Sequence, residues 1–331
     1  MNQSAIVTKD QLVRDLRNIG LEKGDCVSLA VSFKHIGFVD CGPKGFIDAV
    51  REVVGSEGTL LANTHTPSFP LSHIDKGFIF DSRTEPLTGL LPKIMLEEKD
   101  AVRSRHPTCS IVALGSLANY LTQDHDENAR PYLPYEKLAL INGKCLFIGT
   151  ENRLVAIRHE AQRRAGLFCV PKYQGAQYRD RAGKVGLFVW TYPPCMKVLT
   201  RLTPRLQKMG MINMGKIGNG PSIIAHANSL LDAMTFLLTH EPERYLCDDP
   251  FCVDCREIEY KLKLFGKVED PLFFQRSFVF RRIAHARNRF FIISNNRLFF
   301  VAKNKRQMLR PVDTSEALYR RFTNFLQKIT R

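Results

Sequence analysis

The first half of the chain alternates between helical patterns and short apolar runs, and this alternation restricts the fold more than any other feature. Thr8 and Gln11 have the spacing of a capping box ahead of a helix, and Asp25–Ser32 is a candidate strand. Pro43 suits the first turn of the next helix, and Thr59–Thr64 is the strand expected after it. Because the alternation continues to about residue 166, it predicts an α/β fold whose mixed or parallel central sheet carries helices on both faces.

Two histidines stand beside later strand candidates. Ser110–Gly115 and Lys144–Gly149 are short apolar runs; His106 precedes the first, and His159 follows the second within a helical pattern. Open α/β sheets bind ligands outside the C-terminal ends of their strands. We therefore expect the functional site near these two histidines.

The chain is strongly basic, and its charge is concentrated near the C-terminus. Residues 256–331 hold 18 Lys and Arg against 6 Asp and Glu, whereas the first 255 residues hold 30 against 27. This shift in composition divides the chain into an N-terminal domain, residues 1–260, and a basic, Phe-rich extension, residues 261–331.

Two elements are expected in this extension. Arg289–Phe300 has the pattern of a β-hairpin with Asn295–Asn296 at its turn, and a basic amphipathic helix is expected over about residues 314–329. Interleaved Phe and Arg side chains can bind phosphates and stack bases of a nucleic acid, or dock an acidic carrier protein. We favour a hairpin that packs its Phe side chains on the main domain and leaves its Arg side chains in solvent.

Nothing in the sequence indicates secretion or a membrane span. The chain has no apolar run of about 18 residues, and its N-terminus lacks the pattern of a signal peptide. Nine cysteines are an odd number, and through most of the chain they lack the spacing of a disulfide framework. We expect a cytoplasmic protein with reduced thiols.

Three of these cysteines stand close together near the end of the N-terminal domain. Cys247, Cys252 and Cys255 lie in the segment CDDPFCVDC, and His240 lies upstream. Four such ligands could hold a structural zinc ion. Because the spacing is not that of a standard zinc finger, we favour buried, reduced cysteines and do not expect zinc.

Four sequence pieces, in the same order, resemble the aminoglycoside 3-N-acetyltransferase family. They are FKHIGFVDCGP (33–43), RSRHPTCSIVALG (103–115), LPYEKLALINGKCLFIG (133–149) and GKIGNG (215–220). The resemblance runs from about residue 12 to about residue 260. It implies transfer of an acetyl group, or a related acyl group, from acetyl-CoA as co-substrate to the amine of a small molecule.

The resemblance also implies roles for particular side chains. In the family, a strand-end glycine is followed by a helix that carries a histidine and, three residues later, a glutamate; here these positions hold Gly149, His159 and Gln162. His159 is then the general base, since an imidazole with a pKa of about 6.5 can accept the proton of the attacking amine. Gln162 would orient the ring, and His106 would act at the thioester end of the donor. Contacts with acetyl-CoA are expected from polar residues at the strand ends, namely Ser32, His35, Thr64, Thr108 and Ser110.

Several departures from the family pattern remove polar groups. Ala30–Val31–Ser32 stands where the family has H-S-S, Leu133–Pro134 where it has Ser-Pro, and Thr84–Glu85–Pro86 where it has T-P-S. Gln162 can accept a hydrogen bond from the histidine, but it cannot stabilise an imidazolium by charge. We therefore expect a weaker base than in the family.

The charge of one further segment bears on the acceptor. Residues 181–231 contain no Asp or Glu but seven Lys and Arg, and such a wall would repel a polycation. The sequence therefore predicts a neutral or anionic acceptor, such as an amino sugar, rather than an aminoglycoside antibiotic. Two alternatives are kept: an acyltransferase whose basic tail recognises a carrier-protein-borne or tRNA-borne acyl donor, and a catalytically inactive binding module on the same fold.

Overall fold

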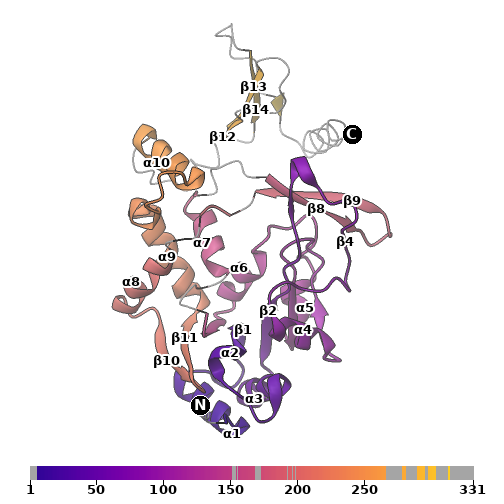
Figure 1. Ribbon diagram of the computed structural model, residues 1–331, viewed down its shortest axis with the longest axis vertical. Coiled ribbons are helices and arrows are strands. Elements are labelled where there is room, and N and C mark those ends of the chain that lie inside the picture. Colours follow the sequence, from indigo (N-terminus) through magenta and orange to yellow (C-terminus); the bar gives the residue numbers. More distant parts are fainter. Residues whose placement is uncertain are drawn as a thin grey trace.

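The computed structural model describes residues 6–150, 154, 156–167, 173–191, 193–195, 197 and 199–265, and the backbone of four strands between residues 278 and 313. A seven-stranded sheet in the order β10-β11-β7-β1-β2-β6-β5 forms the centre of the fold (Figure 1). Its strands are β1 (Cys26–Val31), β2 (Thr59–Asn63), β5 (Val102–Arg103), β6 (Ile111–Gly115), β7 (Lys144–Ile148), β10 (Asn213–Ile217) and β11 (Gly220–His226). β1 pairs in parallel with β2 and β7, and the other pairs are antiparallel, which confirms the predicted mixed sheet.

Helices cover both faces of this sheet, as predicted. Along β7, Cys145 and Phe147 pack into one core while Leu146 and Ile148 pack into the other, because successive strand side chains point to opposite faces. The first core includes α5 (Ala118–Thr122), α6 (Leu133–Leu140), α7 (Ile157–Arg164), α8 (Leu202–Lys208) and α9 (Ala227–His240). The second includes α1 (Lys9–Ile19), α2 (Phe33–Ile36), α3 (Gly42–Val54) and α4 (Leu90–Glu97).

The predicted helix ends are confirmed where the sequence marked them. The Thr8 hydroxyl accepts a hydrogen bond from the backbone N–H of Gln11 at 3.2 Å, so it caps α1. Pro43 lies in the first turn of α3, and Gly55 follows the last residue of that helix with a φ of 69°. These local signals set where α1 begins and where α3 begins and ends.

A second, smaller sheet lies beside the central one (Figure 1). Its main part is an antiparallel ribbon of β8 (Tyr173–Arg179) and β9 (Val185–Thr191), and β8 also pairs with β3 (Phe69–Pro70) and β4 (Ile79–Phe80). A short 3-10 helix, Leu71–His73, follows β3.

The glycine cluster at residues 215–220 forms a hairpin turn, as the sequence indicated. Ile217 pairs with Gly220, so Gly218 and Asn219 are the two turn residues between β10 and β11. Gly218 has a φ of 57°, and an added Cβ would lie 2.8 Å from the carbonyl oxygen of Ile36. α9 begins directly after β11.

The C-terminal part contributes a four-stranded antiparallel sheet of β12 (Phe278–Phe280), β13 (Arg289–Ser294), β14 (Arg297–Ala302) and β15 (Val312–Asp313). Pairing of Ser294 with Arg297 confirms the strands of the predicted hairpin. Its turn, Asn295–Asn296, and the helix expected over residues 314–329 lie outside the described residues.

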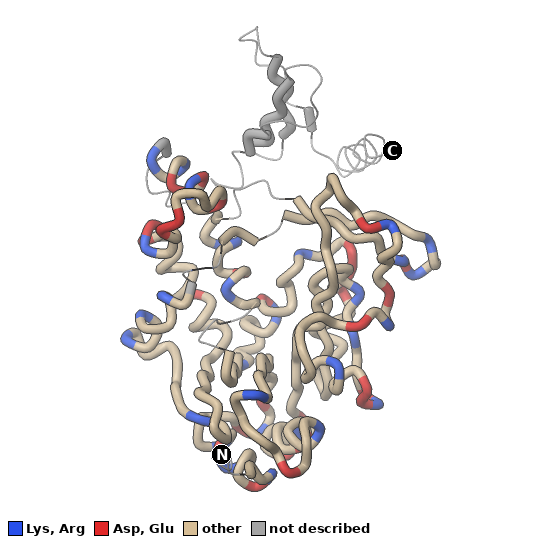
Figure 2. Tube along the Cα trace, in the orientation of Figure 1, with Lys and Arg blue, Asp and Glu red and all other residues tan. Residues whose placement is uncertain are grey.

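The boundary expected after residue 260 falls inside a helix, because α10 spans Val253–Phe265; the division into two domains stays a prediction. Figure 2 shows basic and acidic residues interspersed over the body of the molecule, in keeping with the near balance of the first 255 residues. Among the described residues, no helix combines the length and the apolar character needed to cross a membrane.

Candidate active site

The segments singled out by the sequence meet at one edge of the central sheet. β1, β2 and β7 run in parallel, so their C-terminal ends share this edge, and antiparallel β6 begins there. The residues placed along the edge are Ser32 and His35 after β1, Thr64 and His65 after β2, His106, Thr108 and Ser110 before β6, and Gly149 and Thr150 after β7.

Thr64 and Ser110 tie two of these strand ends together. Their hydroxyl oxygens lie 2.8 Å apart, and the Ser110 hydroxyl donates to the Thr64 carbonyl oxygen at 2.8 Å. The Arg103 guanidinium donates to the Ser110 hydroxyl at 3.3 Å and to the Thr64 carbonyl at 3.2 Å. Both hydroxyls are fully buried and bonded within the protein, so their contact with acetyl-CoA stays a prediction.

Ser32 and His35 lie against the strand-end glycine of β7. The Ser32 hydroxyl and His35 Nδ1 are 2.8 Å apart, and the His35 side chain is exposed. A Cβ added at Gly149 would lie 2.4 Å from the Cβ of His35, and Gly149 has a φ of 62°. Only glycine therefore allows α2 and the end of β7 to approach this closely.

His159 and Gln162 form the pair that their helical spacing predicts. Both side chains are buried on α7, and His159 Nδ1 lies 2.9 Å from Gln162 Oε1. Because an amide oxygen can only accept, Nδ1 carries the proton and Nε2 carries the lone pair. Burial, followed by the charge of Arg158, lowers the pKa of His159 from its ordinary value of 6.5 to about 3.

The turn that leads into α7 has unusual backbone geometry. Leu154 and Ala156 have φ values of 44° and 66°, in the left-handed region that non-glycine residues seldom occupy. The Ala156 carbonyl accepts a hydrogen bond from the backbone N–H of His159 at 2.8 Å. Strained backbone of this kind is common at functional sites, where surrounding structure holds it in place.

Glu160, the carboxylate next to His159 in the sequence, faces a group of arginines. It is fully buried, and its oxygens lie 2.8 Å from Arg163 Nε, 3.5 Å from Arg164 Nε and 3.7 Å from Arg130 Nη1. Its charge is thus balanced by arginines rather than directed at His159, whose ring nitrogen faces Gln162.

His106 is fully buried with its tautomer fixed by the backbone. Its Nδ1 accepts hydrogen bonds from the backbone N–H groups of Thr108 and Cys109, at 3.3 and 3.0 Å, so the proton of the neutral ring is on Nε2. The ring of His125 stacks on it at 4.7 Å, and Phe188 of β9 packs edge-on at 4.7 Å. Burial, followed by the nearby His125, lowers the pKa of His106 well below its ordinary value.

Three aromatic residues that sequence reasoning missed complete this region. The ring of Tyr132 lies 5.0 Å from that of His159 and 6.4 Å from that of His65, so it links the two histidines. His125 lies 2.9 Å from the Ser104 hydroxyl and 3.1 Å from the Pro131 carbonyl oxygen. Burial lowers the pKa of His65 to about 4 and that of His125 to about 3.

Of these three residues, His65 could have been found from the sequence, because it comes just after a strand. His125 and Tyr132 lie in a segment that carries no such sequence signal.

Three buried polar atoms at this edge lack a hydrogen-bond partner within the part of the chain that the structure describes. They are Nε2 of His65, Nε2 of His106 and Oγ1 of Thr150. Buried polar atoms in folded proteins are nearly always paired, so a group of exceptions at one sheet edge suits a bound polar ligand.

Two surface hollows are lined by other residues, although Leu87 of one donates to the His65 carbonyl oxygen and Arg105 of the other donates to the His125 carbonyl oxygen. One, of about 360 Å³, is lined by Glu85–Leu87, Gly89, Leu90 and Lys93, and the other, of about 190 Å³, by Phe80–Arg83, Arg105, Arg179 and Asp180. None of the predicted site residues is among those that line these two hollows.

Comparisons with known proteins identify the family of this sequence. The sequence model of the family described as aminoglycoside 3-N-acetyltransferase matches residues 29–239. Aminoglycoside N(3)-acetyltransferase VIII of Streptomyces fradiae is 35% identical over 176 residues, which are 48% of this chain and 62% of that protein. Aminoglycoside N(3)-acetyltransferase III of Serratia marcescens is 26% identical over 265 residues, 70% of this chain and 98% of the relative. The chain thus spans less than two thirds of the Streptomyces protein.

The fold has solved counterparts as well. AAC-IIIb in binary complex with CoASH superposes with a TM-score of 0.63 at 23% identity, over 71% of this chain and 97% of the other. At this identity the likeness is one of fold, and it confirms the predicted architecture. Since the family model covers more than half of the sequence, the chain belongs to the aminoglycoside 3-N-acetyltransferase family.

Proposed function

We propose that the protein transfers an acetyl group from acetyl-CoA to the amine of a small molecule. The observation that carries this proposal is the His159–Gln162 pair, which Tyr132 connects to a sheet edge with unpartnered buried polar atoms. Membership of the family and the CoASH complex of a protein with the same fold support the choice of donor.

His159 would act as the general base. The amine nitrogen attacks the thioester carbonyl carbon, the C–N bond forms, and the C–S bond breaks with its electron pair leaving on the thiolate. The proton lost by the nitrogen goes to His159 Nε2 and then to the thiolate. Gln162 holds the Nδ1–H at 2.9 Å, so Nε2 stays available as the acceptor. With a pKa of about 3 the ring is neutral at pH 7, ready to accept but weakly basic.

His106 would act on the other side of the reacting carbonyl. Two backbone N–H groups fix the proton on its Nε2, which has no partner among the described residues. A buried N–H donor of this kind can stabilise the negative charge that develops on the thioester oxygen. Thr108 contributes through its backbone, which holds the His106 ring in this tautomer.

The acceptor that we propose is a neutral or anionic amine, such as an amino sugar. The absence of Asp and Glu from residues 181–231 supports it. Three carboxylates from outside that segment, those of Asp126, Glu127 and Asp180, act on Tyr178 and help raise its pKa, although burial is the main cause. The relatives are named for aminoglycosides, so both classes of amine belong in the assay.

Binding of the donor is the first test. Acetyl-CoA should raise the melting temperature of the full chain, since a ligand that binds only the native state stabilises it. Mass spectrometry should then find an acetylated product with an amino sugar or its phosphate and less with an aminoglycoside. No thermal shift at millimolar acetyl-CoA would eliminate the proposed donor, and faster acetylation of an aminoglycoside would eliminate the proposed acceptor.

The alternatives remain predictions with distinct outcomes. Truncation after residue 265 removes the segment to which a carrier-protein or tRNA donor would bind, so it should abolish transfer only if that segment recognises the donor. An inactive binding module would bind CoA without turnover. We place the activity in the cytoplasm, in keeping with eight free cysteines among the described residues.

A further inference from the structure

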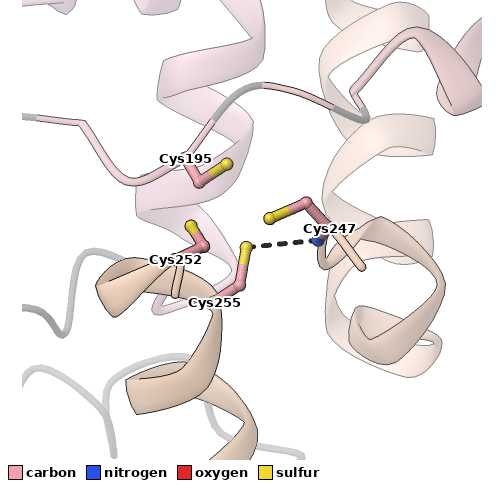
Figure 3. Close-up of side chains that lie close together, drawn as sticks. All are labelled: Cys195, Cys247, Cys252 and Cys255. Carbon is pink, nitrogen blue, oxygen red and sulfur yellow. Dashed lines mark hydrogen bonds between the residues drawn. The ribbon is translucent and has the colours of Figure 1, made fainter. Parts of the chain in front are cut away.

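Four cysteines from three separate segments converge away from the candidate active site (Figure 3). Cys195 follows β9, Cys247 follows a short 3-10 helix (Pro242–Tyr245), and Cys252 and Cys255 lie at the start of α10. Their sulfur atoms all lie within 4.8 Å of one another, and Figure 3 shows the four side chains close together.

This geometry suits a tetrahedral metal centre. A zinc ion with four Zn–S bonds of about 2.3 Å holds its sulfurs roughly 3.8 Å apart, so small side-chain rotations would bring these four into place. All four thiols are free of disulfides. The backbone N–H of Cys247 already donates to Cys255 Sγ at 3.2 Å, a bond that favours a thiolate at this position.

The structure changes the fourth ligand that the sequence suggested. His240 is exposed, and its Nδ1 lies 2.9 Å from the carbonyl oxygen of Phe236, on whose ring it stacks. Cys195 takes that place, although it is 52 positions upstream of Cys247 and no local spacing marks it. The donor set is therefore four sulfurs rather than three sulfurs and an imidazole.

We propose that Cys195, Cys247, Cys252 and Cys255 bind one structural zinc ion. Four thiols release four protons to solvent as four Zn–S bonds form, which leaves a net charge of −2 at the centre. Arg256 lies beside it: its Nη2 donates to the Cys247 carbonyl oxygen at 2.6 Å, and its Nη1 pairs with Glu259 at 2.5 Å. A closed set of four protein ligands has no open position for a substrate, so the ion has a structural role.

The position of the site indicates what the ion holds together. Cys247 and Cys255 are 4% and 1% exposed, while Cys195 and Cys252 are partly exposed and leave a path for the metal. The ion would join the segment after β9 to the start of α10. It would thereby fix the helix that precedes the C-terminal extension to the β8–β9 ribbon, whose Phe188 packs on His106.

Elemental analysis of the purified full chain tests the proposal, and we expect about one equivalent of zinc per chain. Replacement of zinc by cobalt should give the intense d–d absorption of tetrahedral cobalt and a sulfur-to-cobalt charge-transfer band. Cys195→Ser and Cys255→Ser should lose the metal, whereas Cys41→Ser, a change at an exposed cysteine outside the cluster, should keep it. A strong chelator should lower the melting temperature of wild type.

Two results would overturn the proposal, and neither depends on whether a variant folds. One is wild-type protein, produced in zinc-supplemented medium, that contains no metal in stoichiometric amount and gives no cobalt spectrum. The other is an intact mass lower by the hydrogens of two disulfides, with peptides that link these four cysteines in pairs. Either would identify the cluster as reduced or redox-active thiols.

Discussion

The sheet-edge site and the cysteine cluster are both groups of mostly buried side chains that can bind a ligand, but they differ in which atoms they leave without a partner. At the sheet edge, neighbours hold Nδ1 of His106 and of His159, whereas Nε2 of His65 and Nε2 of His106 have no partner among the described residues. In the cysteine cluster, the four sulfurs lie within 4.8 Å of one another. Unpartnered buried polar atoms suit a polar ligand that arrives and leaves, whereas four sulfurs at this spacing suit an ion that stays.

The largest expected effect is a loss of activity from a change at the sheet-edge site that leaves the cysteine cluster intact. His159→Ala should lower kcat/KM for acetyl transfer by about 10²–10⁴-fold, because it removes the proposed base, and should leave the zinc content unchanged. Mass spectrometry measures the acetylated product, and elemental analysis measures the zinc content. His73→Ala, at an exposed histidine, is the matched control and should be silent. Undiminished activity of His159→Ala would show that the reaction does not use this ring.

Acid should destabilise the sheet-edge region strongly. Between about pH 4 and 6.5 the unfolded chain binds protons on imidazoles that stay neutral in the folded protein, so stability falls as pH falls through this window. From pH 7 to pH 5 the loss should be roughly 1–2 kcal/mol for each of His65, His125 and His159.

Urea unfolding of chelator-treated protein at both pH values measures this loss without a contribution from the metal. His125→Asn should reduce the difference in unfolding free energy between pH 7 and pH 5 by the contribution of one histidine, roughly 1–2 kcal/mol. His73→Asn, at an exposed histidine, should not change this difference. Equal stability at pH 5 and pH 7 would contradict the neutral state of these rings.

A pair of glycine substitutions isolates the close approach at the sheet edge. Gly149 and Gly183 both have positive φ, at 62° and 81°, but only Gly149 has the side chain of His35 where a Cβ would be, whereas Gly183 has open space. Gly149→Ala should therefore cost about 1–3 kcal/mol more in unfolding free energy than Gly183→Ala. Equal costs in urea titrations would mean that backbone strain alone matters at both positions.

The smallest effect tests the departure from the family at position 162. Gln162→Glu should raise the pKa of His159 by about 1, because a carboxylate at this distance stabilises the imidazolium. NMR titration of the histidine signals measures the change, and Gln123→Glu, at an exposed glutamine, is the control. An unchanged pKa would show that burial and Arg158 outweigh the new charge.

Features set by short-range patterns could be predicted from the sequence. The Thr8 cap, the strands Cys26–Val31 and Thr59–Asn63, and the contact of His159 with Gln162 all follow from residues a few positions apart. The depth of burial could not be predicted, since it depends on how distant segments pack. For this reason the low pKa of His159 and the addition of Cys195 to the cysteine cluster emerged only from the structure.

The separation of Cys195 from its partners has a consequence for the order of folding. Between Cys195 and Cys247 the chain forms α8, β10, β11 and α9. Of these, β11 is a strand of the central sheet, and α9 packs against that sheet. On a ribosome, where N-terminal segments emerge first, the four thiols can meet only after these four elements and the start of α10 have been synthesised. Closure of the cluster is thus a late event in the synthesis of the chain.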